Sequence, residues 1–487
     1  MKQETTVAID AATSRRPGSE LRNVLAMAVP AVITTSSRAA MDVIDYVMVA
    51  QLPTHDAQAA ILPAQIVMWS YIVFGLGVVT MVNTFAAQAL GRGARRETAA
   101  YAWQGIYVAA FFGVLATAVV AFVPDAVAWI GHEPGVQKNE IAYMRIALLT
   151  TGPTLVAEGL GWFFIGIHRP KVPMWTALEA IVVNFVVALV LIFGFFGIEP
   201  MGIAGAAWGT MAAVCYRSVR LGASFLAPSV HSVFRSREAW RPSLKRLARL
   251  LRVGIPCGLQ LTSEIVVWAI FVNILIGRKF GTSHLIATNA AWQYMRVAFM
   301  PTLGVGRALS ALVGKSIGER DHRRARRETR IAAVLTVTYM GVLSFIYMIW
   351  GEQLIRILAH DDEVARIGRG IMICTAVFQL FDAVGITYTY SLRGAGDTFI
   401  PSVFFVVSHW LIIVGGGWWI ATTFPGLGSL GPWIAAATLI GATAVFLWWR
   451  WHGGAWMQID LFGDGPGPRA TTVASQPPAE VAASCDR

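Results

Sequence analysis

Long apolar runs, separated by short polar or basic segments, recur from residue 22 to residue 451. Each run has about 20 residues or more, the length of an α-helix that crosses the hydrocarbon core of a bilayer. The pattern predicts twelve spans, at residues 22–51, 64–89, 101–123, 141–166, 174–198, 202–224, 253–277, 285–312, 329–350, 371–391, 400–423 and 431–451. The predicted fold class is therefore an all-α integral membrane protein.

The composition agrees with this reading. Of 487 residues, 56% are hydrophobic and 14% are charged, and the mean hydropathy is +0.58, which excludes an ordinary soluble protein. The net charge of +11 comes from Lys and Arg concentrated in alternate loops, such as "RSREAWRPSLKRLARLLR" and "KSIGERDHRRARRETR". By the positive-inside rule these loops and both termini are predicted to be cytoplasmic. The basic loops are interpreted as topology signals, with a nucleic-acid or regulatory site as the less favoured alternative, and no nucleic acid is expected as a partner.

No cleavable signal peptide is predicted, because the polar first twenty residues lead into an apolar run too long for one. Three cysteines lie in spans and none forms a CxxC motif, so Cys215, Cys257 and Cys374 are expected to be free thiols. No cofactor is expected beyond a coupling ion.

The two halves of the chain share several features. A proline lies near the start of the first span of each half, at Pro30 and Pro256. The segments "LGRGARRE" and "GIHRPKVP" in the first half correspond to "KSIGERDHRRARRE" and "LRGAGDTFIP" in the second. Because six spans separate the repeats, both halves enter the membrane in the same orientation, which predicts two pseudo-symmetric six-helix lobes around a central cleft. The predicted boundaries are a tail at 1–20, lobes at 21–224 and 246–455, a cytoplasmic linker at 225–245 and a disordered tail at 456–487 that is rich in Gly, Pro, Ala and Ser from Asp464 onward.

Charged residues interrupt the predicted spans. A charge at the centre of a membrane helix costs roughly 2.5–3.5 kcal/mol on insertion scales, so such residues indicate function. The acidic ones are Asp42, Asp45, Glu158, Glu179, Glu264 and Asp382, and the basic ones are Arg38, Arg296 and Arg307. Since pairing can neutralise at most three of the six, the remaining carboxylates must be protonated, bind a cation or face water.

The most direct partner of Arg38 is Asp42, because residues four apart lie on the same helix face. This pairing would leave Asp45 as the carboxylate free to titrate. A contact between Arg38 and Glu264 is the alternative, since each lies eight residues after the proline of its half. For Glu158 and Glu179 a structural and a functional role are equally open.

Asp382 is the leading candidate for ion coupling. It lies in "FQLFDAVGITYTYSLRG", with Gln379 one turn before it and hydroxyl groups beyond. A buried carboxylate near other oxygen ligands can hold Na⁺ or exchange a proton, and the alternative is a role in helix packing only.

Three of these segments resemble the multidrug and toxic compound extrusion (MATE) family, in particular its NorM-type branch: "MDVIDYVMVAQL", "GIPCGLQLTSEIVVW" and "FQLFDAVGITYTYSLRGAGDTFIP". The resemblance implies a coupling role for Asp45, Glu264 and Asp382, with Na⁺ as a candidate ligand of Glu264 and Asp382, and it matches Asn184 to a position that is often Asn. It also implies a monomeric exporter, not an enzyme, in a bacterial inner membrane. Such an exporter expels cationic amphiphilic molecules in exchange for Na⁺ or H⁺ through a V-shaped cleft.

Two departures leave the coupling ion open. Phe378 occupies a position where the sodium-type branch often has Tyr, and Ala188 occupies one that is polar or acidic in some branches. The alternative function is a lipid or lipid-linked oligosaccharide flippase of the same superfamily, which would need many more cationic residues than three arginines. An enzyme is not favoured, because no DDxxD, HExxH or GxSxG motif occurs in a plausible context.

Overall fold

The computed structural model describes residues 17–52, 55–130, 134–359 and 361–463. Within them the first half contains α2 (Pro17–Ala50), α3 (His55–Gly91), α4 (Arg95–Val119), α5 (Val123–Ile130), α6 (Pro134–Leu149), α7 (Thr151–Gly166), α8 (Lys171–Phe193), α9 (Ile203–Leu226) and α10 (Pro228–Phe234). The second half contains α11 (Leu244–Ile270), α12 (Thr282–Gly318), α13 (His322–Leu358), α14 (Asp362–Ala395), α15 (Phe399–Ser408), α16 (Gly417–Thr423) and α17 (Leu430–His452). The predicted all-α fold is confirmed.

Each predicted span coincides with one of these helices or with a pair of them. By length and composition, ten helices of the described residues could cross a membrane, and an eleventh span results if α6 and α7, which meet at a bend of 43°, are taken together. The remaining predicted span is α9, a helix of 24 residues that carries Arg217 and Arg220 in its second half.

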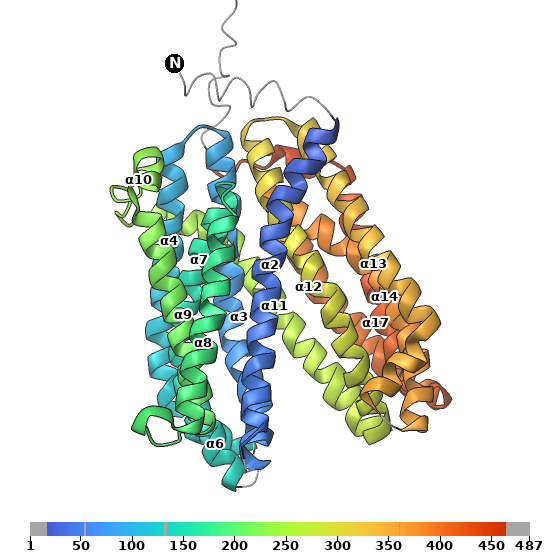
Figure 1. The fold of residues 1–487 in the computed structure, drawn as a ribbon. Coiled ribbons are helices and arrows are strands. Elements are labelled where there is room, and N and C mark those ends of the chain that lie inside the picture. Colours follow the sequence, from blue (N-terminus) through green and yellow to red (C-terminus); the bar gives the residue numbers. More distant parts are fainter. Residues whose placement is uncertain (1–16, 53–54, 131–133, 360, 464–487) are drawn as a thin grey trace, which may run out of the picture.

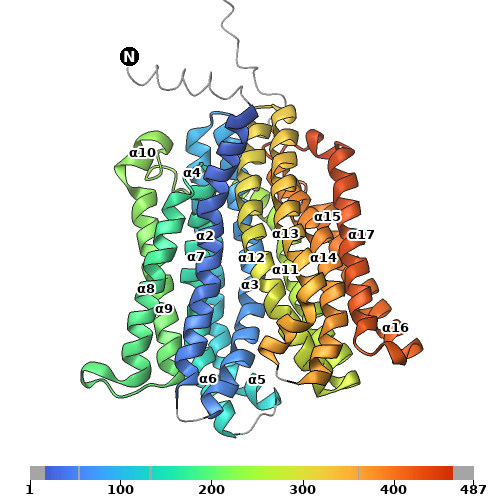
Figure 2. The ribbon, with the colours of Figure 1, turned by 45° about the vertical axis from the view of Figure 1, so that its right-hand side comes forward.

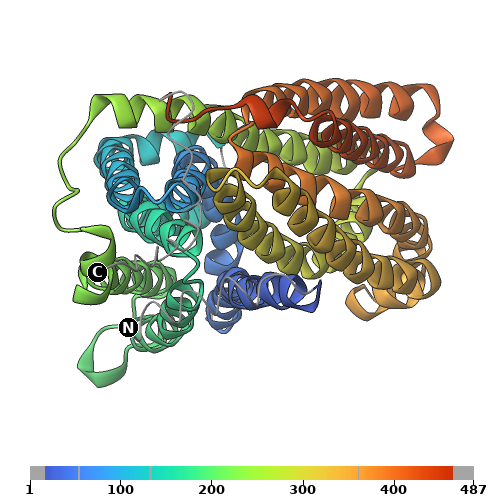
Figure 3. The same cartoon turned by 90° about the horizontal axis from the view of Figure 1, so that it is seen from above.

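The helices form two lobes that lie side by side (Figures 1 and 2), the first made of α2–α10 and the second of α11–α17. Seen from above (Figure 3), the segment after α10 runs around the outside of the first lobe to reach α11. The first helix of each lobe packs against the other lobe, because α2 contacts α12 while α11 contacts α3. These two reciprocal contacts between the lobes have the pseudo-symmetry that the repeated motifs predict.

The two lobes approach most closely where small residues allow backbone contact. A Cβ atom added at Gly77 of α3 would lie 2.5 Å from the Cα atom of Gly258 of α11, and one at Gly304 of α12 would lie 2.4 Å from the Cα atom of Val32 of α2. The end of the molecule where α2 begins and α17 ends is here called the basic end (Figure 1). At this end Gly91 of α3 and Gly318 of α12 are in close contact. Towards the opposite end the ribbons of α11 and α12 diverge from α2 (Figure 1).

Replacing Gly77 with alanine should destabilise this contact, because the added methyl group would meet backbone atoms, which cannot rotate away as a side chain can. We expect a loss of about 1–3 kcal/mol, the usual cost of overpacking, measured as a lower thermal midpoint of the purified protein. Gly222→Ala is the matched control, since nothing lies within 4 Å of a Cβ atom at that helical position. Equal midpoints for the two variants would contradict the close contact.

The second lobe contains two π-helical segments, Phe271–Arg278 after α11 and His409–Gly416 after α15. The two segments pack against each other. His409 is buried, and its Nδ1 atom lies 2.8 Å from the carbonyl oxygen of Phe405. Its position agrees with a packed, hydrogen-bonded histidine. π-Helical turns, which are wider than α-helical ones, often occur at functional sites.

The chain remains packed beyond α17. Ala455–Gln458 form a short 3₁₀ helix, and Trp456 and Phe462 are buried. The packed structure therefore continues past residue 456, because these two large aromatic side chains anchor the segment. Residues 464–487 lie outside the described residues. Cys215, Cys257 and Cys374 are free thiols, and Cys485 lies outside the described residues.

Candidate functional site

The first polar cluster lies within the first lobe, around Asp45 of α2. This residue is only 3% exposed, and its Oδ2 atom accepts a hydrogen bond of 2.8 Å from the Thr210 hydroxyl of α9. Asn184 of α8 is fully buried and lies beside the same carboxylate. The Oδ1 atom of Asp45 and both amide heteroatoms of Asn184 are buried without a hydrogen bond of normal length to any described residue. The cluster therefore keeps unused capacity for a proton or a cation.

The second cluster lies within the second lobe, around Glu264 of α11 and Asp382 of α14. The two side chains are partly buried and close enough to repel each other electrostatically. Among the described residues neither carboxylate has a hydrogen bond or an ion pair within 4 Å. One turn before Asp382, Gln379 is 2% exposed, and neither of its amide heteroatoms has a partner among the described residues. Asp382 and Glu264, far apart in sequence, are thus brought together as two carboxylates without a fixed counter-charge.

Arg393, near the end of α14, is the cation whose charge acts on Glu264. It is 7% exposed, donates from Nη2 to the Oε1 atom of Gln260 at 3.4 Å, and stands over the ring of Tyr390 at 5.3 Å. The sequence analysis missed Arg393 because it assigned this residue to the loop after the tenth span.

Arg38 and Asp42 form the intrahelical pair predicted from their spacing, with 3.5 Å between Nε and Oδ1. The guanidinium also lies over the ring of Trp69 at 4.7 Å. The alternative contact with Glu264 is wrong, because Arg38 is held within the first lobe by these two neighbours. Asp42 is thus neutralised locally, and Asp45 is not.

Glu158 of α7 joins the two lobes. Its Oε1 atom lies 2.7 Å from Nη1 of Arg217 on α9, and its Oε2 atom lies 3.5 Å from Nη1 of Arg307 on α12. Arg307 also stands over the ring of Trp162 at 4.6 Å. The count of three arginines within the spans is therefore wrong, since Arg217 lies inside the predicted sixth span, at residues 202–224, and within α9.

Glu179 of α8 accepts a hydrogen bond of 2.9 Å from the Tyr216 hydroxyl and lies 3.6 Å from Nε of Arg220. Its side chain is 36% exposed. Glu179 therefore has a hydrogen-bond donor and a basic neighbour, both on α9.

Thr210 and Arg217 contact Asp45 and Glu158, and Arg393 acts on Glu264, but none of the three stands out in the sequence pattern. Threonine is common in membrane helices, so Thr210 carried no signal of its own. Arg217 already lies inside the predicted sixth span, at residues 202–224, and was left out of the count of charged residues there, whereas only a longer tenth span would have included Arg393.

The chemistry available here is ion exchange. Among the described residues no three His, Cys, Asp or Glu side chains are grouped to hold a metal ion. The oxygen atoms of Glu264, Asp382 and Gln379 are instead the ligand type that Na⁺ accepts, and each carboxylate is also a site for one proton. The paired lobes and these buried acidic groups define a polytopic membrane transporter. The chain belongs to the MatE family, whose model matches it twice, at residues 30–190 and 259–419.

The double match independently shows the internal repeat, since each half carries one copy. A curated relative, the probable multidrug resistance protein NorM of Rhizobium meliloti (strain 1021), is 28% identical over 439 residues, covering 89% of this chain and 93% of the relative. The family resemblance is thereby confirmed, and the protein is a transporter rather than an enzyme.

Two solved structures share the fold. A crystal structure titled as MATE in the straight conformation has a TM-score of 0.81 at 18% identity, covering 90% of this chain and 97% of that one. A MATE family transporter titled as being in an outward-facing conformation has a TM-score of 0.80 at 17% identity, with the same two coverages. At these identities the likeness establishes the fold alone.

Proposed function

We propose that the protein is a cation-coupled antiporter that exports cationic amphiphilic drugs, toxins or metabolites by alternating access. The observation that carries this proposal is the Glu264–Asp382 pair, two carboxylates of different helices without a salt bridge among the described residues. Like charges held together away from water are stabilised when one of them takes up a cation or a proton. Asp382, Glu264 and Asp45 are the proposed coupling residues, with Gln379 and Asn184 in support.

The exchange follows from competition for the same charge. A carboxylate that is neutralised by the coupling ion no longer attracts a cationic substrate, so ion and substrate favour different arrangements of the lobes. The lobes contact each other at the basic end and diverge towards the other (Figure 1). With the basic end in the cytoplasm, as the positive-inside rule suggests, this arrangement is closed on the cytoplasmic side. The proposed location is a bacterial inner membrane, with both termini in the cytoplasm and a monomeric chain.

The available driving force is sufficient for export. One monovalent cation moving down a potential of roughly 100 mV releases about 2.3 kcal/mol, and a unit pH gradient adds about 1.4 kcal/mol for a proton. Together these support roughly a several-hundred-fold gradient of a neutral substrate.

In proteoliposomes that contain the purified full-length protein, we expect ethidium to move against an imposed Na⁺ or H⁺ gradient. Fluorescence quenching follows the dye, and imposing each gradient alone distinguishes the two ions. Protein-free liposomes give the background. Ethidium movement that stays at background under both gradients would exclude ion-coupled export of this substrate class.

The flippase alternative is less favoured. Arg38 is paired with Asp42, and Arg217 and Arg307 share Glu158, so three of the arginines at membrane depth are already neutralised. A pyrophosphate-bearing substrate would need such cations to be unpaired. Arg296 of α12 and Arg393 of α14 remain, and two arginines on separate helices do not provide the many cations that such a group needs.

A further inference from the structure

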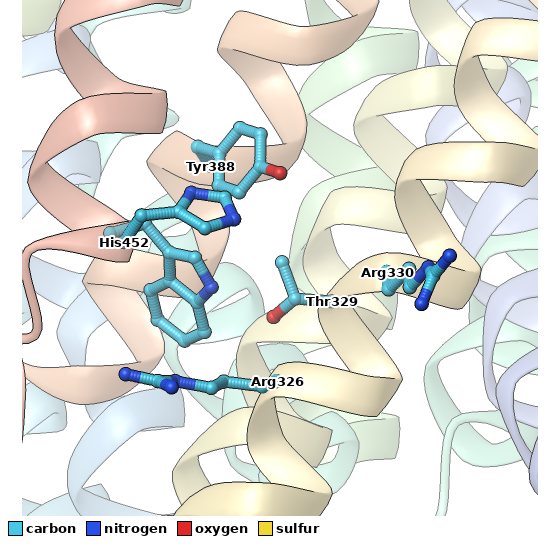
Figure 4. Close-up of a pocket in the computed structure, with 6 residues that line it drawn as sticks. Arg326, Thr329, Arg330, Tyr388 and His452 are labelled. Atoms are coloured by element: carbon cyan, nitrogen blue, oxygen red, sulfur yellow. The ribbon is translucent and has the colours of Figure 1, made fainter.

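A cavity of about 340 Å³ lies between α13, α14 and α17, outside both polar clusters of the proposed transport site (Figure 4). It is near the basic end, because α13 begins there and α17 ends there. Its lining residues are Arg326, Thr329, Arg330, Tyr388, Trp451 and His452. The lining thus offers guanidinium, imidazole, indole and hydroxyl groups, and it includes no carboxylate.

Two arginines give the cavity its charge. Arg326 and Arg330 are four residues apart on α13, and in Figure 4 the Arg326 side chain extends towards the side of His452 while Arg330 points the other way. Both are exposed, and neither has an ion pair with any described residue. Acidic residues of the neighbouring segments already have basic partners: Glu328 lies 2.9 Å from Arg324, Asp397 lies 2.8 Å from Arg450, and Glu20 lies 3.3 Å from Arg327. An anion in the cavity would give Arg326 a counter-charge that the described residues do not supply.

The opposite wall is aromatic. Trp451 is buried and stacks on Trp456, with 4.2 Å between ring centroids. His452 lies 5.7 Å from the ring of Tyr388, and its Nδ1–H donates to the carbonyl oxygen of Trp448 at 2.8 Å, which leaves Nε2 for another partner. These contacts hold the imidazole on the side of the cavity opposite α13 (Figure 4).

The surface beside the cavity is apolar. On α17, the side chains of Trp448 and Trp449 are 48% and 61% exposed, and Val445, one helical turn before Trp449, is 61% exposed. Tryptophans exposed at the end of a membrane helix typically lie at the level of the lipid headgroups. An anion bound in the cavity would therefore lie where the headgroup of a neighbouring lipid meets the acyl-chain region.

We propose that this cavity binds a phosphate group carried by an anionic phospholipid of the cytoplasmic leaflet. Arg326 contacts the phosphate oxygens, a pairing that charge-assisted hydrogen bonds favour, and Arg330 adds a second positive charge at the rim. The volume corresponds to roughly ten water molecules at about 30 Å³ each, enough for a phosphoglycerol headgroup. The acyl chains lie along the exposed face of α17. Since Tyr388 and Asp382 are both on α14, the lipid would fasten a helix that carries a coupling carboxylate.

The test uses the full-length protein purified in a neutral detergent, titrated with phosphatidylglycerol, phosphatidylcholine or inorganic phosphate and followed by native mass spectrometry. We expect phosphatidylglycerol adducts on the wild-type protein and at least a tenfold loss of affinity in the Arg326→Gln/Arg330→Gln variant, with the weaker phosphatidylcholine binding unchanged. The charge-matched control is Arg241→Gln/Arg323→Gln, which removes two exposed arginines that do not line the cavity.

Equal losses in the two double variants would overturn the proposal, because general surface charge would then explain the binding. Inorganic phosphate that binds as tightly as phosphatidylglycerol would overturn the lipid assignment in favour of a soluble phosphate ligand. If the double variant does not fold, Arg326→Gln replaces it, since this residue is also exposed and its side chain extends towards the His452 side of the cavity, and an affinity equal to that of the wild type would again reject the site. Tyr388→Phe, which removes one hydroxyl group, should cause a smaller loss than either arginine variant.

Discussion

Asp382→Asn should reduce ion-driven ethidium export at least tenfold, to near the level of protein-free liposomes. Asparagine keeps the size and hydrogen-bonding capacity of the side chain but cannot be charged, so it removes the exchangeable ion and leaves the packing of α14 intact. Glu264→Gln should behave similarly, because the charge of Glu264 acts on Asp382 and both carboxylates are proposed coupling residues. The double variant should be no worse than the single ones, since residues that act as a unit are strongly non-additive.

Asp362→Asn is the matched control, with the same substitution on the same helix. Asp362 is exposed in the first turn of α14 and is paired with Arg356 at 2.5 Å, far from the Glu264–Asp382 pair. The Asp362→Asn variant should export ethidium as fast as the wild-type protein. If Asp382→Asn transports normally while Asp45→Asn does not, the coupling ion belongs to the first lobe and our assignment to the second lobe fails.

Glu158→Gln should lower the thermal stability of the purified protein substantially. The substitution leaves the guanidinium groups of Arg217 and Arg307 without their shared counter-charge, and these side chains are only 11% and 18% exposed. Removing one partner of a buried ion pair typically costs about 3–5 kcal/mol. Because Arg307 belongs to the second lobe, part of this loss should appear as weaker contact between the lobes. The measurement is the thermal midpoint, combined with labelling of a cysteine placed at the lobe contact.

Glu179→Gln provides the comparison, since Glu179 and Arg220 form a more exposed pair at 3.6 Å. Such pairs contribute about 0–1 kcal/mol, so the midpoint should hardly move. Midpoints that fall equally in the two variants would mean that the Glu158 bridge contributes no more than a surface pair.

Local patterns predicted the helices and some of the charge pairs correctly. Apolar runs located all twelve spans, since membrane crossing demands a minimum length of apolar helix. The pairing of Arg38 with Asp42 followed from helix geometry, because both partners lie on consecutive turns of one helix. The repeat was also visible in the motifs of the two halves, and the double family match confirms it.

Contacts between segments that are far apart in the chain could not be predicted from local sequence patterns. Glu158 could be assigned neither a structural nor a functional role, because its partners come from α9 and α12, 59 and 149 residues further along the chain. Likewise, Thr210 gained significance only when α9 placed its hydroxyl against Asp45. The error concerning Arg38 and Glu264 has the same origin, since matching offsets in two repeats give matching depths but do not say which way a side chain turns.

The sequence alone determined the membrane class, the number and order of the spans, the two-fold repeat and the list of intramembrane acids, because each depends on residues that are close together in the chain. Only the tertiary structure decided which acids have counter-charges. It joined Glu158 to both lobes, left Glu264 and Asp382 within electrostatic reach of each other without a salt bridge in the described part of the chain, and formed the cavity beside Arg326 and Arg330. The physical reason is that charge neutralisation depends on distances across helix interfaces, which helical periodicity within one segment does not fix.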